Sequence, residues 1–371
     1  MQELNIGEVV TDGVVADSGG AVLQKKKRSV NRAKLQDNIW GWIFVILMVL
    51  GTTFFVYFSF IVTVILSFSN YSGGNIFEYF GEIEPFRDDA LYWYKRMFVD
   101  ETHSQYFWNT LGNSFFYLLG IPVGMVLSIA LAVCMTRDIK GTNAFRVIYY
   151  VPTVASAVSL SLIWKRLFNN SGAINEIFGT QIQWLTSTDG VIKKITVLIM
   201  TVWKGLGGSI VLFVAGLNGV NVSYHEAADI DGANAWQIFW RITMPQLYPT
   251  IFYVLVTSVI GGMQIYIEPE LIFGSFYASN TTPGGQSQTS PFVSYIFGEV
   301  NSAGNYAYAS ALGVILTIII FLMTVESIRE SLRRQTELGS LSEDSLRDMI
   351  MAQGVFGNNR HHITVPADEL R

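Results

Sequence analysis

Residues 40–68 read WGWIFVILMVLGTTFFVYFSFIVTVILSF, an apolar run of 29 residues without a charged side chain. About 20 helical residues already cross a hydrocarbon core of roughly 30 Å. Five further runs share this character: Trp108–Cys134, Val147–Trp164, Ile195–Tyr224, Ile242–Ile267 and Val300–Val325. Of the 24 basic and 29 acidic residues, only Lys204 lies inside a run. A soluble globular protein spreads charge along every exposed face, so this segregation excludes that class.

The runs predict a fold class as well as a location. Lipid offers the backbone no hydrogen bonds, and the runs are too long for barrel strands. We therefore expect an all-α membrane protein with six transmembrane helices. The first run exceeds the 7–15 apolar residues of a signal peptide, which favours a retained span.

The loop charges predict the orientation of the spans. Basic residues precede the first run, occupy the short loop 135–146 and follow the last run; they are Lys25, Lys26, Lys27, Arg28, Arg32, Lys34, Arg137, Lys140, Arg146, Arg329, Arg333 and Arg334. Segment 69–107 carries seven acids against three bases. By the positive-inside rule both termini are cytoplasmic. One set of residues breaks the rule, because Lys165, Arg166, Lys193 and Lys194 then lie in an outside loop.

This topology predicts three parts: a basic cytoplasmic segment 1–38, a six-span domain 39–330 and a polar cytoplasmic tail 331–371. In the tail, Ser342 is a candidate cap for a short helix ending at Met351. The basic N-terminal segment fits a topology determinant, with contact to anionic lipid as the alternative.

Residues 221–246, NVSYHEAADIDGANAWQIFWRITMPQ, are unlike the other connections. Ser223 and Glu226 have the spacing of a capping box, which predicts the start of a helix. Gly232 permits a turn, a second short helix fits 234–242, and Pro245 stops or kinks it. The sequence thus predicts a cytoplasmic helix-turn-helix hairpin. Its aromatics suit a membrane interface, whereas its small residues and acids suit a docking partner.

The spacing of this loop resembles the cytoplasmic motif of permeases in binding-protein-dependent ABC importers. Glu226-Ala227-Ala228, Gly232, Ile242 and Pro245 match, and Met244 replaces the usual Leu. The resemblance covers roughly residues 40–330 and is similar to the carbohydrate-uptake branch of maltose and multiple-sugar importers. In the fifth span it departs, since Thr281, Thr282, Pro283 and Gly284 keep only part of that branch's pattern.

The resemblance implies the type I importer permease fold in a bacterial plasma membrane, importing a sugar or oligosaccharide. It implies four kinds of partner: a second permease, two ATP-binding subunits, an extracytoplasmic solute-binding protein and membrane lipid. The loop would form coupling helices that contact the ATPase through Glu226, Ala227, Ala228, Asp229, Gly232 and Pro245. ATP and magnesium would bind the partner subunits, and this chain would need no cofactor.

Lys204 marks the candidate substrate path. A charge inside a span should face a water-filled cavity or a partner, although a lysine can also snorkel outward. The outer end of the fifth predicted span reaches the same depth in the membrane as Lys204 in the fourth. The candidate residues from both spans, which line the pocket in maltose-type members, are Trp203, Lys204, Gly208, Met263, Gln264 and Tyr266. A lone lysine leaves open an acidic sugar.

Other activities find little support in the sequence. No stretch matches the phosphate-binding pattern G-x-x-x-x-G-K-[ST], no catalytic spacing stands out, and no Cys/His spacing suits a metal. The net charge of −5 gives no basic field for nucleic acid, and Cys134 has no second cysteine for a disulfide. An ion-coupled secondary transporter is the alternative function, but it should show internal repeats and a carboxylate within a span.

Overall fold

In the computed structural model, the described residues are 9–13, 26–30, 32–74, 89–136, 142–274, 276 and 288–356. Several sequence expectations fall outside them: Lys25, the charges of residues 75–88, the bases Arg137 and Lys140, the stretch Thr281–Gly284, and the end of the tail. The chain divides into two compact units, Met1–Leu66 and Ser67–Arg371.

The first unit contains a short hairpin followed by an apolar helix. Strand β1 (Val9–Gly13) pairs antiparallel with β2 (Lys26–Val30), with Val9 opposite Val30. This hairpin was not expected from the sequence. Helix α1 (Arg32–Thr52) continues through the π-helical segment η1 (Thr53–Phe58) into α2 (Ser59–Leu66). Residues Gly41–Leu66 are long and apolar enough to cross a membrane, which agrees with the first predicted run.

The second unit is helical in its described part. Its elements are α4 (Tyr92–Val99), α5 (Glu101–Leu118), α6 (Gly120–Met135), α7 (Thr142–Val154), α8 (Ala157–Leu167), α9 (Ala173–Phe178), α10 (Gly190–Asn218), α11 (Val222–Ile230), α12 (Ala235–Ile238), η2 (Phe239–Thr243), α13 (Met244–Met263), α14 (Ile267–Phe273), α15 (Phe292–Gly298), η4 (Glu299–Ala303) and α16 (Tyr306–Phe356). The segments η2 and η4 are π-helical.

The membrane spans are confirmed, with one change of shape. Four further described helices pass the length and apolarity test for a span: Glu101–Met135, Gly190–Asn218, Ala235–Met263 and Tyr306–Arg333. The third predicted run is instead a bent pair, in which α7 and α8 meet at 102°. Counted as one span, the pair brings the described total to six, as the charge pattern predicts.

Three predicted boundaries were wrong. The fourth run ends in α10 at Asn218, because the chain turns there before the loop hairpin begins. The sixth span begins at Tyr306, since Gly304 adopts a positive φ of 67° and separates it from η4. Ser342 starts no helix of its own: α16 runs unbroken to Phe356. At about 1.5 Å per residue, α16 is far longer than a bilayer requires.

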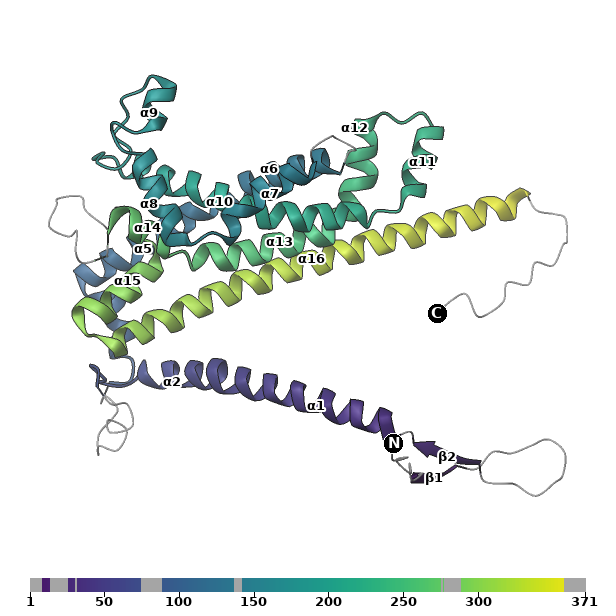
Figure 1. The fold of residues 1–371 in the computed structure, drawn as a ribbon, viewed down its shortest axis with the longest axis horizontal. Helices are drawn as coiled ribbons and strands as arrows, with labels where there is room; N and C mark the ends of the chain where they lie inside the picture. The colour runs from purple at the N-terminus through teal and green to yellow at the C-terminus, as the bar shows by residue number, and fades with distance from the viewer. Residues whose placement is uncertain are drawn as a thin grey trace, which may run out of the picture. The chain divides into compact units, whose positions relative to one another are not determined.

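The helices of the second unit have two distinct ends. Helix α10 packs against α6, α7 and α13, and α13 packs against α16. Figure 1 shows α11 and α12 at one end of this bundle and α8, α9, α14 and α15 at the other. The two ends therefore belong to opposite sides of a membrane.

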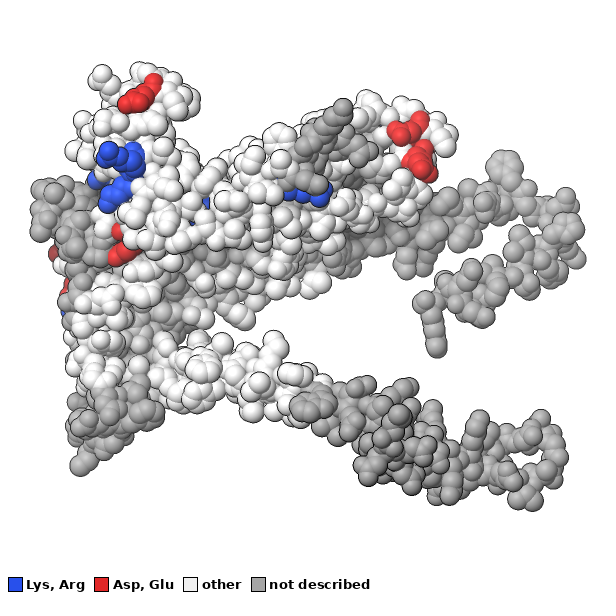
Figure 2. Space-filling model, in the orientation of Figure 1, with Lys and Arg blue, Asp and Glu red and all other residues white. Residues whose placement is uncertain are grey.

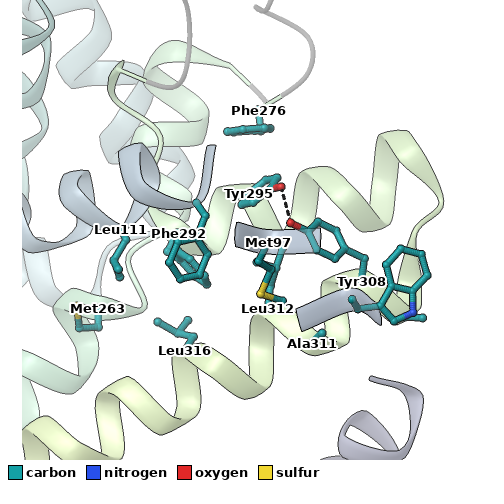
Figure 3. Close-up of a cluster of buried hydrophobic side chains, with 13 residues drawn as sticks. Met97, Leu111, Met263, Phe276, Phe292, Tyr295, Tyr308, Ala311, Leu312 and Leu316 are labelled. Atoms are coloured by element: carbon teal, nitrogen blue, oxygen red, sulfur yellow. Dashed lines mark hydrogen bonds between the residues drawn. The ribbon is translucent and has the colours of Figure 1, made fainter. Parts of the chain in front are cut away.

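The largest cluster of buried side chains holds the helices together at the end of the bundle that contains α15. Side chains from α4, α5, α15 and α16 meet there, as Figure 3 shows, and Tyr295 and Tyr308 join their hydroxyl groups at 3.0 Å. Lipid is as apolar as a buried leucine, so such packing and hydrogen bonding, rather than escape from water, hold membrane helices together.

Candidate functional site

A cavity of about 770 Å³ opens within the second unit. Helices α5, α6, α7, α10, α13 and α15 and the segment 264–268 form its wall; the residues are Tyr117, Gly120, Ile121, Gly124, Met125, Ser128, Thr153, Thr201, Val202, Lys204, Gly205, Ser209, Ser258, Gly261, Gly262, Gln264, Ile265, Tyr266, Ile267, Glu268, Val293 and Phe297. The volume lies within the range of small-molecule sites, and the wall mixes apolar groups with a few hydroxyls and one amide.

Lys204 and Glu268 form an ion pair in this wall. Lys204 Nζ lies 2.5 Å from Glu268 Oε1, and the two side chains are 26% and 11% exposed. An intramembrane lysine needs such a partner or water, because an unpaired charge is costly to desolvate. Lys204 therefore faces the cavity, and the carboxylate of Glu268 balances its charge there.

Glu268 reaches Lys204 because the chain breaks between α13 and α14. Helix α13 ends at Met263, residues 264–266 are not helical, and α14 begins at Ile267 and packs against α8. Within the break, the ring of Tyr266 stacks on that of Phe297 with centroids 4.3 Å apart and planes 18° apart. The break thus brings the amide of Gln264, the ring of Tyr266 and the carboxylate of Glu268 into the cavity wall, with Phe297 stacked on Tyr266.

Small residues let α7 cross α10 close to this ion pair. A Cβ at Gly207 would collide with the carbonyl oxygen of Tyr149 and the hydroxyl of Thr153. Thr153 also donates to the backbone oxygen of Lys204 at 3.3 Å. On the other side, a Cβ at Gly120 would approach Val202 to 2.9 Å. Only glycine allows these contacts, and they fix the backbone from which Lys204 projects.

The candidate path residues divide into two groups. Lys204, Gln264 and Tyr266 line the cavity. Trp203 packs edge-on against Trp164, with centroids 5.3 Å apart, and Met263 is fully buried in the cluster of Figure 3. Gly208 faces the methyl group of Thr153, at 3.7 Å from an added Cβ. The structure therefore does not bring Trp203, Met263 or Gly208 into the lining, and all six roles stay predictions.

Sequence reasoning missed several lining residues. Glu268 lies directly after the fifth run, and neither it nor Phe297 was among the candidates. The Gly120 and Gly124 pair has the small-xxx-small spacing of packed membrane helices, and both residues line the cavity. That spacing could have pointed to the start of α6.

The hairpin of residues 221–246 forms as predicted in outline. Gly232 adopts a φ of +73°, and the amide of Ala233 donates to the oxygen of Ala228 at 3.0 Å, closing the turn. His225 Nε2 lies 3.4 Å from the hydroxyl of Thr243, which ties α11 to η2. Glu226 and Ala227 are exposed on the resulting hairpin, whereas Ala228 is buried. Figure 2 shows acidic side chains gathered over α11.

Two details of the hairpin differ from the prediction. The cap of α11 is Asn221, whose side chain accepts from the amide of Ser223, so Ser223 and Glu226 do not form the capping box. A capping box does occur at the second helix, between Asn234 and Gln237. Helix α12 passes through the π-helical η2 into α13, and Pro245 lies inside this continuous helix, directly after η2. Pro245 therefore neither stops the helix nor ends the hairpin.

The basic residues that break the positive-inside rule are partly accounted for. Lys194 Nζ lies 3.3 Å from Asn113 Oδ1 and 4.9 Å from the ring centroid of Phe116. Lys165 donates to the backbone oxygen of Leu271 at 3.4 Å. Figure 2 shows basic side chains gathered over α8. These two lysines make contacts within the fold, and the orientation of the spans stays a prediction.

Next to α8, the connection to α10 is built around Asn175. Its amide nitrogen donates to the backbone oxygens of Asn170 and Ile182 at 3.0 and 2.9 Å. Its amide oxygen accepts from Thr180 Oγ1 and Trp184 Nε1 at 2.9 and 3.0 Å. All four hydrogen-bonding capacities of this buried side chain are used, so the segment is a defined structure.

No group of three His, Cys, Asp or Glu side chains suited to a metal ion occurs among the described residues.

Comparison with known proteins places these features in context. The family model described as "Binding-protein-dependent transport system inner membrane component" matches residues 120–335. The probable ABC transporter permease protein YesP of Bacillus subtilis is 28% identical, covering 82% of this chain and 93% of that protein. The multiple sugar-binding transport system permease protein MsmF of Streptococcus mutans is 29% identical, covering 80% and 97%.

Two further matches extend the comparison. The arabinooligosaccharides transport system permease protein AraP of Bacillus subtilis is 30% identical, covering 60% of this chain and 70% of that protein. A chain in the crystal structure of a bacterial alginate ABC transporter, in complex with an alginate pentasaccharide-bound periplasmic protein, has a TM-score of 0.64. It is 19% identical and the match covers 81% of this chain and 96% of that one, which shows a shared fold.

Proposed function

Because this chain belongs to the family of binding-protein-dependent transport system inner membrane components, we propose that it forms one wall of the path by which an ATP-driven importer takes up a sugar or oligosaccharide. Relatives named for multiple sugars and arabinooligosaccharides support the substrate class. Membership in this family disfavours an ion-coupled secondary transporter.

The observation that carries the proposal is the cavity. It lies between helices that cross the membrane and reaches from Ser128 on α6 to Glu268 on α14. Sugars offer hydroxyl groups and apolar ring faces. The wall offers matching groups: the hydroxyls of Thr153, Ser209 and Ser258, the amide of Gln264 and the rings of Tyr266 and Phe297. An aromatic face can stack on a sugar ring while amides and hydroxyls exchange hydrogen bonds.

The energy source belongs to partner subunits in this proposal. The sequence contains no phosphate-binding loop of the G-x-x-x-x-G-K-[ST] type, so ATP would bind two separate ATPase subunits. A second permease would supply the opposite wall, and an extracytoplasmic binding protein would deliver the sugar. The alginate transporter structure contains such a periplasmic protein, and it supports the last of these partners.

The hairpin formed by α11 and α12 is the proposed ATPase contact. It lies at the opposite end of the second unit from α9 and α14 (Figure 1), so the two sets of elements lie on opposite sides of the membrane, and we assign the hairpin to the cytoplasmic side. Glu226 and Asp229 are exposed on α11, where they offer two anionic groups to a partner. Trp236 and Trp240, 70% and 49% exposed, lie on α12 and in its extension toward the membrane, a level where tryptophan is favoured.

The test is reconstitution of the assembled importer in liposomes. We expect ATP-dependent uptake of at least one labelled oligosaccharide, and no ATP hydrolysis by this chain alone. Sugar uptake driven by an ion gradient without ATP, or hydrolysis by the isolated chain, would contradict the proposal. Genes for a solute-binding protein and a second permease beside this one would identify the partners to combine.

A further inference from the structure

The charges in the cavity wall point to the kind of sugar. Among the described lining residues, Lys204 is the one base and Glu268 the one acid, and they are 2.5 Å apart. A carboxylate this close balances the charge of the ammonium group, so the wall presents no uncompensated positive charge to a ligand. Every other polar lining residue is a hydroxyl or amide side chain.

The groups around the pair add to this conclusion. Glu270, two residues further along α14, is a second acidic side chain on this helix, outside the described lining. Lys165 also contacts α14, but its ammonium donates to the Leu271 backbone and is exposed outside the lining. An anionic ligand would therefore meet a lysine that is already paired with a carboxylate, and no other base in the described lining.

A neutral hydroxyl group finds a better match. Ser209, Ser258 and Gln264 line the cavity with side chains that are partly or fully exposed. A sugar hydroxyl can exchange hydrogen bonds with these neutral groups at little desolvation cost. The carboxylate of a uronic acid can accept from the same groups but must also give up its hydration inside the membrane.

We propose that this wall selects uncharged oligosaccharides over uronate-containing ones, and that Glu268 sets the preference by neutralising Lys204. The inference rests on the proposed function and deepens it, since it names the charge class of the sugar. Replacing Glu268 by Gln keeps the size and one acceptor but leaves Lys204 without its counter-charge. An anionic sugar then gains a cation at close range.

The experiment uses the assembled importer in nanodiscs without its binding protein, whose own selectivity would mask that of the wall. Binding is measured with two labelled panels of two to six sugar units, one neutral and one of uronates. We expect the wild type to prefer neutral sugars by at least about tenfold, since one charge contact of this kind is worth one or two powers of ten. Glu268→Gln should lower that ratio about tenfold.

Two further variants control for poor assembly and for the loss of a carboxylate outside the cavity. The double variant Lys204→Met/Glu268→Gln has no unpaired charge and should keep the neutral preference even if Glu268→Gln alone assembles poorly. Glu176→Gln, which removes an exposed carboxylate on α9 outside the lining, should match the wild type.

The outcomes separate the two claims. A wild-type preference for uronates, or an unchanged ratio in an assembled Glu268→Gln complex, overturns the inference and leaves the sugar permease in place. Failure of the double variant to keep the neutral preference also overturns it. Binding of neither panel by the wild type contradicts the proposed function, and the inference falls with it.

Discussion

The ammonium of Lys204 on α10 and the carboxylate of Glu268 on α14 meet at 2.5 Å although 64 residues separate them in the chain. The pair joins α14, which follows the helix break at residues 264–266, to α10. The pair bears on the charge of the sugar that the cavity accepts and on the stability of the protein.

For stability, Lys204→Met should destabilise the protein because Glu268 keeps its charge in a site where its side chain is only 11% exposed. Removing one partner of a buried pair costs about 3–5 kcal/mol, and the partial exposure of Lys204 reduces this to about 2 kcal/mol. Thermal or detergent unfolding of the purified protein measures it. The control is Lys95→Met, whose pair with Asp89 is 60% and 47% exposed and is worth less than about 1 kcal/mol. Equal effects of the two variants would show that the cavity pair is not buried.

Gly207 should tolerate no side chain. Gly207→Ala places a methyl group against the carbonyl of Tyr149 and the hydroxyl of Thr153, which forces α7 away from α10. Overpacking of this kind costs about 1–3 kcal/mol, and unfolding measurements should show it. Gly205→Ala is the matched control two residues earlier, because an added Cβ there meets nothing within 4 Å. A Gly207→Ala variant as stable as Gly205→Ala would contradict the close crossing.

The two alanines of the hairpin should respond differently to enlargement. Ala227 is exposed, so Ala227→Leu should leave the permease stable while reducing its copurification with the ATPase subunit. Ala228 is buried, so Ala228→Leu should disturb the hairpin itself and lower its protection from proteolysis. Normal copurification of the Ala227→Leu protein would argue against ATPase docking on this surface.

Asn175 should hold the connection between α8 and α10. Asn175→Ala removes four hydrogen bonds and leaves buried partners such as the backbone oxygen of Ile182 unsatisfied. Each lost bond of this kind costs about 1 kcal/mol, so we expect the amides of residues 172–187 to exchange much faster with deuterium. Asn170→Ala is the control, since Asn170 contributes its backbone oxygen to this network. Equal exchange in the two variants would contradict the role of Asn175.

The spans were predictable from the sequence because charge and hydropathy are summed over many residues. Such a sum does not show whether the chain runs straight through the membrane or bends. The run Val147–Trp164 is as apolar as a straight span, yet the chain bends by 102° after Val154. Pro152 and Ser156 were the local signs of a break, and an apolar average conceals them.

The cavity was only partly predictable for a related reason. Lys204 stands out because it is the one charge within a span, and Gln264 and Tyr266 follow from the depth of the fifth span. Glu268 enters the wall only because the chain leaves the helix at Gln264 and starts another at Ile267. Met263, one residue earlier, faces the core instead of the cavity. Sequence periodicity predicts which residues share a helix face but not where that helix breaks.

The central claim is that the cavity lined by Gln264 is the sugar path, and its water accessibility tests this most directly. Cys134 is the only cysteine, so Gln264→Cys in a Cys134→Ser chain gives a single thiol to label in an importer assembled from cysteine-free partners. A thiol at position 322 on α16, where Leu322 is 60% exposed, is the lipid-facing control. We predict that a water-soluble maleimide labels residue 264 but not 322, that ATP changes the labelling rate, and that the transported sugar slows it. Labelling at position 264 that responds to neither ATP nor sugar, or no labelling there at all, would contradict the account.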